Sequence, residues 1–247
     1  MHSCVSMIVQ GDSRNKALYV AAVSDVHSPR YLDEFRTSIS TCRRPDVFLL
    51  AGDMIESGSV HEYKKVADAV NSRFGDDTPI VACFGNEENR DVREEVVRLV
   101  GHRIKFLEDT TFRVDIGEAK VVIVGASPVV PDRVVSQVGR TSSIRKSLEK
   151  RAERLSKLLA EAANTSTHTI LLVHYSPLVQ GARENHSNAF SWWVSKIMEL
   201  ARPDVIVHGH VHNAAQTKIV IDHTTVLNVA FPLVKDVTEF PLQCPSN

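Results

Sequence analysis

The chain has 247 residues, of which 24 % are charged, and its formal net charge is −1. A chain of this length can bury a large hydrophobic core without disulfides, and we expect one domain over residues 1–247. The near-neutral charge argues against the global basic field that is typical of nucleic-acid-binding and membrane-surface proteins.

The cysteine pattern favours a reduced, intracellular protein. Four cysteines are scattered along the chain without a C-x-x-C pair: Cys4, Cys42, Cys83 and Cys244. Cys83 lies inside an apolar run, so we expect it to be a small core residue. No apolar run approaches about 18 residues, and the N-terminus lacks a basic region followed by an apolar one. These features predict a cytoplasmic protein without a membrane partner.

The first half of the sequence alternates strand and helix patterns. Residues 30–42 carry Leu32, Phe35 and Ile39 at helical spacing, which predicts a helix that covers a sheet. The expected strands are 17–24, 47–51 and 80–84, and the expected helices are 30–42, 59–73 and 89–100. Residues 1–16 are assigned no structure.

The second half adds antiparallel strands. Residues 112–126 predict a hairpin that turns at Gly117, and residues 142–163 carry the strongest helical stripe. The remaining expected elements are strands at 169–173, 204–208, 216–221 and 224–230, a helix at 190–201, loops at 126–140 and 180–189, and a loose C-terminal tail. This order predicts an α/β (α+β) fold in which two mixed sheets pack face to face with helices outside.

Potential metal ligands follow five of the apolar runs: Asp25 and His27, Asp53, Asn86, His174, and His210 with His212. Each signal is weak alone, because Gly-Asp and Gly-Asn are common in turns and a single histidine such as His174 is often a core residue. The run Gly209-His210-Val211-His212 is more specific, although such residues, His208 among them, can also form the polar face of an edge strand. The five strand ends together favour a site of oxygen and nitrogen ligands.

The ordered set D-x-H, G-D, G-N, H and G-H-x-H resembles the calcineurin-like metallophosphoesterase family, and it spans residues 25 to 212. The resemblance implies a four-layer α-β-β-α sandwich. It also implies one metal ion held by Asp25, His27, Asp53 and His212, and a second held by Asp53, Asn86, His174 and His210. Asp53 would then bridge the two ions.

The resemblance further implies a metal-dependent phosphoesterase, with a phosphodiesterase favoured over a monoesterase. A hydroxide between the two ions would attack phosphorus, and the catalytic residues would be Asp53, Asn86, His174 and His210. Mixed imidazole, carboxylate and amide ligands favour Mn²⁺, with Fe, Ni²⁺ or Zn²⁺ as alternatives. A small phosphoester is the expected substrate; a DNA or RNA nuclease and a non-catalytic binding scaffold are the alternatives, and homo-oligomerisation is left open.

One position departs from the family pattern. Many members have a histidine after the asparagine, and that histidine contacts phosphate and assists the leaving group; here Glu87 follows Asn86. We expect Glu87 to turn away or to orient another group, because a carboxylate repels phosphate. His186 and His61 are candidates for the general acid, but for both residues we favour a surface position without a catalytic role. Without a dedicated acid, activity should favour good leaving groups.

Two further pairs of residues invite a functional interpretation. Arg183 and Arg90 are expected to rim the site, where either can clamp a phosphate, although we favour a solvated surface role for Arg90. Trp192 and Trp193 cannot both face the same side of a helix, so we expect at least one of them in the core.

Overall fold

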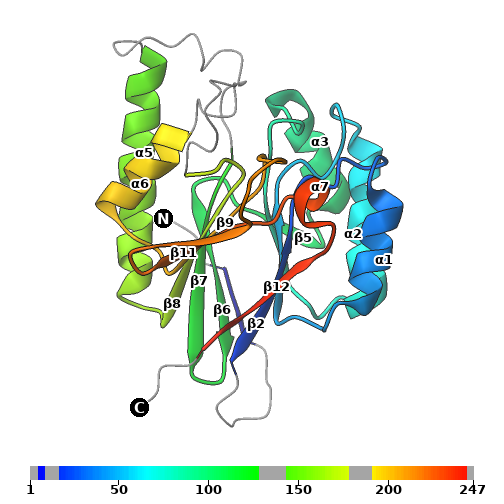
Figure 1. Ribbon diagram of the computed structural model, residues 1–247, viewed down its shortest axis with the longest axis horizontal. Helices are drawn as coiled ribbons and strands as arrows, with labels where there is room; N and C mark the ends of the chain where they lie inside the picture. Colours follow the sequence, from blue (N-terminus) through cyan, green and yellow to red (C-terminus); the bar gives the residue numbers. More distant parts are fainter. Residues whose placement is uncertain (1–4, 9–16, 128–142, 178–190, 244–247) are drawn as a thin grey trace.

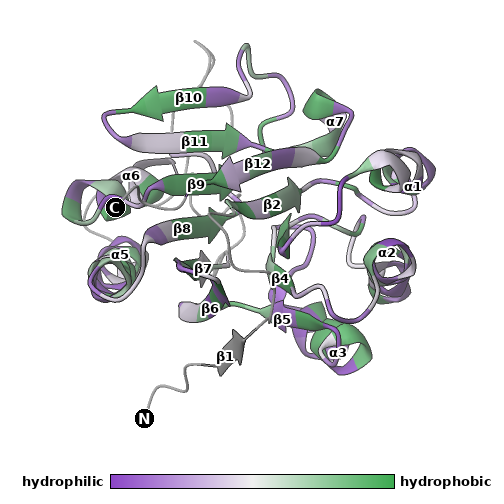
Figure 2. Cartoon of the chain, turned by 90° about the horizontal axis from the view of Figure 1, so that it is seen from below, coloured by the Kyte–Doolittle hydropathy of each residue, from purple (hydrophilic) through white to green (hydrophobic). Residues whose placement is uncertain are grey.

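Two β-sheets pack face to face between two layers of helices (Figure 1). The computed structural model describes residues 5–8, 17–127, 143–177 and 191–243. The helices α1 (Leu32–Thr41), α2 (Val60–Phe74) and α3 (Arg90–Val100) lie on one side of the sheets, and α5 (Ser143–Ala163) and α6 (Ser191–Leu200) lie on the other (Figure 2). The predicted four-layer sandwich of two mixed sheets is confirmed.

The five-stranded sheet has the order β12-β2-β3-β4-β5. Its strands are β2 (Leu18–Val23), β3 (Val47–Ala51), β4 (Ile80–Cys83), β5 (Ile104–Phe106) and β12 (Thr238–Leu242). The strands β2, β3, β4 and β5 are parallel, and β12 runs antiparallel to β2. Each residue of β3 and β4 is buried, as expected for parallel strands covered on both faces.

The seven-stranded sheet has the order β1-β6-β7-β8-β9-β11-β10. Its strands are β1 (Val5–Ile8), β6 (Thr110–Ile116), β7 (Ala119–Ala126), β8 (His168–Val173), β9 (Val205–His208), β10 (Lys218–Ile221) and β11 (Thr224–Asn228). The predicted hairpin is confirmed, because β6 and β7 pair antiparallel with Ile116 opposite Ala119. The strands β7, β8 and β9 are parallel neighbours.

Three apolar layers hold these elements together. The helices are α1 (Leu32–Thr41), α2 (Val60–Phe74), α3 (Arg90–Val100), α5 (Ser143–Ala163), α6 (Ser191–Leu200) and the short α7 (Phe231–Val234). One core lies between the two sheets, a second under α1, α2 and α3, and a third under α5 and α6. The expected stripe of α1 is buried at Leu32, Phe35 and Ile39, and Cys83 is a core residue as predicted.

Four elements escaped the sequence patterns. The expected loose tail contains β12, an edge strand in which Pro241 stands opposite Tyr19. Proline is tolerated there because an edge strand does not need every N–H group for pairing. The others are β1, the three-residue β5 and α7, which are too short for a periodic signal.

Within the described ranges, no helix has the length and apolar character needed to cross a lipid bilayer. Cys42 and Cys83 are both buried free thiols. The predicted loops at 126–140 and 180–189 lie almost wholly outside the described residues.

Candidate metal centre

The candidate ligands follow the carboxyl ends of five parallel strands. Asp25 and His27 follow β2, Asp53 follows β3 and Asn86 follows β4 in one sheet, whereas His174 follows β8 and His210 and His212 follow β9 in the other. Parallel neighbours deliver their carboxyl ends to the same edge of a sheet, which is where such folds place their ligands. The face-to-face packing of the sheets then brings both edges together.

A first group of ligand atoms consists of Asp25, His27 and His212, and the atoms lie within 4.8 Å of one another. Nε2 of His212 lies 2.9 Å from Oδ1 of Asp25, and Nε2 of His27 lies 3.7 Å from the same oxygen. The imidazole rings of His27 and His212 meet edge to face with their centroids 5.6 Å apart. Two imidazoles and one carboxylate therefore converge on one point.

A second group consists of Asp53, His174 and His210. Nε2 of His174 lies 3.2 Å from Nδ1 of His210 and 3.3 Å from Oδ2 of Asp53. The amide oxygen of Asn86 lies 3.0 Å from the same nitrogen of His174 and so joins this group. Nδ1 of His174 lies 2.9 Å from the carbonyl oxygen of Ala51, which can only accept, so this hydrogen bond places a proton on Nδ1.

Hydrogen bonds connect the two groups. Oδ2 of Asp25 in the first group accepts the backbone N–H of His210 in the second at 3.0 Å. The carbonyl oxygen of Asp53 accepts the backbone N–H of His27 at 3.1 Å. The groups are therefore parts of one centre, with Asp53 and Asp25 between them.

The glycines of the G-D, G-N and G-H motifs permit close backbone approach. A Cβ atom on Gly52 would lie 2.6 Å from the backbone nitrogen of Gly85, and Gly52 also has a φ of +84°. A Cβ atom on Gly85 would overlap the carboxylate of Asp53, and one on Gly209 would overlap the carboxylate of Asp25. Glycine is required at these positions because the turns touch one another and the ligands.

Four candidate ligands have left-handed backbone conformations: Asp25 (φ 58°), His27 (φ 41°), Asp53 (φ 54°) and His210 (φ 68°). Non-glycine residues adopt such angles at a cost, and they cluster at sites where a side chain must point in a particular direction. Here the unusual backbone aims side chains from the strand ends into the centre.

Mutual electrostatics shift the pKa values of the first group. Burial by itself raises the pKa of Asp25, but the hydrogen bonds with His212 and His27 outweigh it and hold that pKa well below its usual range. Burial by itself lowers the pKa of His27, and the Asp25 and Asp53 carboxylates overcome it and raise the pKa. The group therefore carries an ionised carboxylate that attracts cations.

The two histidines of the second group are shifted in opposite directions. Burial lowers the pKa of His174, but the charge of Asp53 dominates and raises the pKa to about 10. Burial and the neighbouring His174 lower the pKa of His210 to about 4. A cation between them, whether a proton or a metal ion, satisfies the lone pairs that converge there.

Comparison with family models decides the classification. The model of the calcineurin-like phosphoesterase family matches residues 18–214, which include every candidate ligand. The chain belongs to the calcineurin-like phosphoesterase family. A comparison with curated protein sequences finds no match.

Solved structures with a similar fold are found at low sequence identity. The protein TT1561 of Thermus thermophilus has a TM-score of 0.57 at 13% identity, with 92% of this chain and 99% of that chain covered. A dimetal phosphatase from Danio rerio has a TM-score of 0.59 at 10% identity, covering 92% and 94%. GAP50, the anchor in the inner membrane complex of Plasmodium, has a TM-score of 0.57 at 13% identity, covering 88% and 73%.

Glu88 is a residue of the centre that the sequence reasoning missed. It is fully buried, and its carboxylate accepts N–H groups from the turns that carry Asp53 and Asn86. Burial and then the charge of Asp53 raise the pKa of Glu88 to about 7, whereas N–H groups of Gly85 and Asp53 act in the opposite direction. Its place two residues after Asn86, in the turn that follows β4, was the available signal.

Two further neighbours of the ligands carried no sequence signal. Oγ of Ser24 donates a hydrogen bond to Oδ2 of Asp25 at 2.5 Å, which fixes that carboxylate. The buried ring of Tyr175 contacts the rings of His174 and His210, with centroids 5.3 and 4.7 Å away. Serine and tyrosine are common in cores, so only the three-dimensional contacts reveal these roles.

Glu87 is engaged by the backbone. Its carboxylate oxygen Oε2 accepts the N–H of Ser57 at 2.8 Å, and its own N–H donates to Oδ1 of Asp53 at 2.8 Å. Neither group of ligand atoms includes its carboxylate. The expectation that Glu87 orients another group agrees with this contact with the loop before α2.

The remaining sequence candidates have different outcomes. His61 on α2 and Arg90 at the start of α3 are exposed, and Trp193 is the buried member of the tryptophan pair. The edge-strand interpretation of His208 is wrong, because β9 lies between β8 and β11 and His208 is buried. Burial lowers its pKa to about 4. Arg183 and His186 lie outside the described residues.

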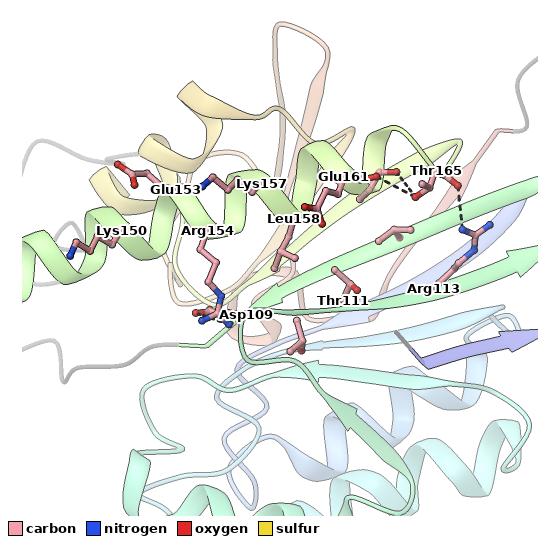
Figure 3. Close-up of a pocket in the computed structure, with 13 residues that line it drawn as sticks. Asp109, Thr111, Arg113, Lys150, Glu153, Arg154, Lys157, Leu158, Glu161 and Thr165 are labelled. Carbon is pink, nitrogen blue, oxygen red and sulfur yellow. Dashed lines mark hydrogen bonds and ion pairs between the residues drawn. The ribbon is translucent and has the colours of Figure 1, made fainter. Parts of the chain in front are cut away.

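A groove of about 730 Å³ lies apart from these ligands, between α5 and β6. Figure 3 shows Arg154 and Leu158 pointing from α5 toward β6 and Thr111 pointing from β6 toward α5. Arg154 donates a hydrogen bond to the carbonyl oxygen of Asp109 at one end of the groove. The described lining mixes basic and acidic side chains, and none of it is a candidate metal ligand.

Proposed function

We propose that the protein is a metal-dependent phosphoesterase that favours phosphodiesters. The observation that carries the proposal is the convergence of two ligand groups, Asp25, His27 and His212 beside Asp53, His174 and His210, at the carboxyl ends of parallel strands. Membership of the calcineurin-like phosphoesterase family supports the same reaction class. We treat residues 1–247 as one domain, because both sheets share a core.

The donor chemistry fits two divalent ions. Nδ1 of His174 is occupied by the Ala51 carbonyl, which leaves Nε2 to face the oxygens of Asn86 and Asp53. Imidazole, carboxylate and amide ligands together suit first-row transition ions, and we propose Mn²⁺ ahead of Fe, Ni²⁺ or Zn²⁺. Asp25, His27, Asp53 and His212 would hold one ion, and Asp53, Asn86, His174 and His210 the other.

When bound, two such ions supply positive charge that offsets the charge on the phosphoryl oxygens and lowers the pKa of water. The residues of the chain hold the geometry. Ser24 fixes the orientation of the Asp25 carboxylate, and the Ala51 carbonyl fixes the ring and the proton of His174. Such supporting contacts are what keep ligands aligned through turnover.

The leaving-group preference rests on Glu87. Its carboxylate accepts a backbone N–H and stands where many family members have a proton-donating histidine. A site without that donor depends on the intrinsic stability of the leaving group. Aryl phosphodiesters are therefore the substrates that we expect it to cleave best.

The test is hydrolysis of bis-p-nitrophenyl phosphate and p-nitrophenyl phosphate with added Mn²⁺, Ni²⁺, Fe²⁺ or Zn²⁺. The expected result is faster cleavage of the diester, its loss on removal of metal by a chelator, and its recovery when Mn²⁺ is restored. Faster cleavage of the monoester would overturn the diesterase assignment. No cleavage of either compound with any of the four ions would overturn the enzyme assignment.

A binding scaffold of the same fold is the second candidate. Glu87 in place of histidine favours it, and so does the structural similarity to GAP50, which is described as an anchor. A scaffold with a vestigial centre would bind Mn²⁺ weakly and cleave neither ester. A nuclease is not favoured, because the net charge of −1 offers no overall attraction for a polyanion.

A further inference from the structure

We infer that Glu88 is a positioning residue, whose carboxylate clamps the turn that carries Asp53 to the turn that carries Asn86 and thereby sets the affinity of the centre for metal. The inference rests on the proposed function only for the metal; the clamp itself is a feature of the fold. Glu88 lies beyond the ligands, and the candidate ligand sets do not include it.

Four backbone N–H groups converge on this one carboxylate. Oε2 accepts the N–H of Asp53 at 2.9 Å and that of Gly85 at 2.7 Å. Oε1 accepts the N–H of Met54 at 2.6 Å and that of Ile55 at 3.2 Å. Each oxygen is therefore fully used, and three of the donors come from consecutive residues beginning with Asp53.

The donors belong to turns that follow two different strands. Residues 53–55 follow β3, whereas Gly85 follows β4 and precedes Asn86. The two turns touch, because a Cβ on Gly52 would lie 2.6 Å from the nitrogen of Gly85. The carboxylate of Glu88 bonds to both turns at once, and the N–H of Glu87 adds one more bond to Oδ1 of Asp53, so the relative position of the turns depends on these contacts.

The backbone of Glu88 is fixed by a residue of α3. Nε of Arg93 on α3 donates to the carbonyl oxygen of Glu88 at 2.9 Å, and the guanidinium stacks on the ring of Phe84 at 5.0 Å. Nη1 of Arg93 donates a hydrogen bond to Oε1 of Glu108 at 2.8 Å. The clamp is thus fixed to α3 and excludes water, since Glu88 is 0 % exposed.

A glutamine at this position keeps the size of the side chain but changes its chemistry. Its NH₂ group is a donor, so it faces two of the four N–H donors without accepting from either. Either Met54 and Ile55 or Asp53 and Gly85 therefore lose their acceptor, which loosens the hold of the side chain on the turns that carry the ligands. Groups that orient metal ligands in this way typically change metal affinity by about 10–100-fold.

The experiment compares Glu88→Gln with the wild type and with Glu118→Gln, which removes the same charge at the exposed turn between β6 and β7. Amide hydrogen exchange of the metal-free proteins is measured at Met54, Ile55 and Gly85, with Leu171 in β8 reporting global opening. We expect exchange to rise about tenfold or more in Glu88→Gln at Met54 and Ile55 or at Gly85, whichever faces the NH₂ group, and to stay unchanged at Leu171. Glu118→Gln should match the wild type.

Mn²⁺ affinity, measured by titration calorimetry, is the second readout. We expect it to fall about tenfold or more in Glu88→Gln and to recover in part in Glu88→Asp, which restores the carboxylate on a shorter side chain. If Glu88→Gln does not fold, Glu88→Asp is compared with the wild type by both readouts, with smaller changes of the same sign expected.

Unchanged exchange at Met54, Ile55 and Gly85 would overturn the clamp. Faster exchange with unchanged Mn²⁺ affinity would overturn the positioning role and leave Glu88 a purely structural residue. If the wild type binds no Mn²⁺, the proposed function fails, together with the link between Glu88 and metal affinity, while the exchange readout still decides whether the two turns are clamped.

Discussion

Nε2 of His174 and Nδ1 of His210 lie 3.2 Å apart, although His174 follows β8 and His210 follows β9. Two neutral imidazole nitrogens at this distance must share a cation or a proton, since two lone pairs repel each other. The amide oxygen of Asn86 faces the same nitrogen of His174 at 3.0 Å.

Metal affinity should rise with pH. Burial lowers the pKa of His174, but the charge of Asp53 raises it to about 10 in the metal-free protein. The stability that the protonated ring contributes is therefore complete below its ordinary pKa of 6.5 and is lost as pH rises through about 10. A metal ion must displace this proton, so we expect Mn²⁺ affinity to increase about tenfold per pH unit between pH 7 and 9.

Calorimetric titrations in two buffers of different ionisation enthalpy measure this proton release directly. The expected value includes about one proton from His174 for each ion bound to the second group. An Mn²⁺ affinity that does not change between pH 7 and 9 would show that Nε2 of His174 carries no proton in the metal-free protein.

Asp53→Asn should remove metal binding and hydrolysis. The amide replaces one carboxylate oxygen by a donor and removes the negative charge that would bridge two cations. Since even groups that only orient ligands cost about 10–100-fold, we expect diester hydrolysis to fall by more than about a hundredfold. Hydrolysis of bis-p-nitrophenyl phosphate and metal content after dialysis check this.

The control for that change is Asp115→Asn on β6, where the carboxylate pairs with Arg113 outside the centre. It should keep its metal and its activity. If Asp53→Asn retains activity comparable to this control, Asp53 does not bridge the ions.

Glu87→His should raise activity toward poor leaving groups. A histidine in this place can donate a proton, and a positioned general acid contributes about 10²–10⁴ in rate. We expect at least a tenfold gain with an alkyl phosphodiester and little change with bis-p-nitrophenyl phosphate, whose leaving group needs no acid; both are measured as kcat/KM.

Glu87→Gln separates the two effects of that substitution, because it removes the charge without adding a proton donor. It should give a smaller gain than Glu87→His. Equal gains in the two variants would assign the effect to the lost negative charge rather than to acid catalysis.

Gly85→Ala should destabilise the protein and weaken metal binding together. The added methyl group would overlap the Asp53 carboxylate, so the two turns must separate. Overpacking of this kind costs about 1–3 kcal/mol, measured by urea unfolding. Gly117→Ala is the comparison: its φ of +57° is strained for alanine, but nothing lies within 4 Å of the new Cβ.

Gly117→Ala should therefore cost about 1–2 kcal/mol of stability through its backbone alone and leave Mn²⁺ affinity unchanged. If both glycine variants keep wild-type Mn²⁺ affinity, the close approach of Gly85 to Asp53 does not position the ligand.

Much of the architecture was readable from local patterns. Residues 47–51 form a strand with the predicted bounds, because a parallel strand buried on both faces is a continuous apolar run. The helix α5 was equally clear, since its apolar stripe repeats with the helical period over 21 residues. The strand β12 could not be predicted, because it contains Pro241 and three further half-exposed or exposed residues and therefore has no apolar pattern. It forms by pairing with β2.

The sequence by itself determined the order of the ligands and their places at strand ends, because buried strands and their glycine turns are encoded by neighbouring residues. Tertiary structure decided that Asp25 meets His212 across 187 positions and that Glu88 joins two turns. It also decided that Glu87 turns to Ser57. These contacts depend on how the two sheets pack and which buried N–H groups lack a partner, and no local pattern carries that information.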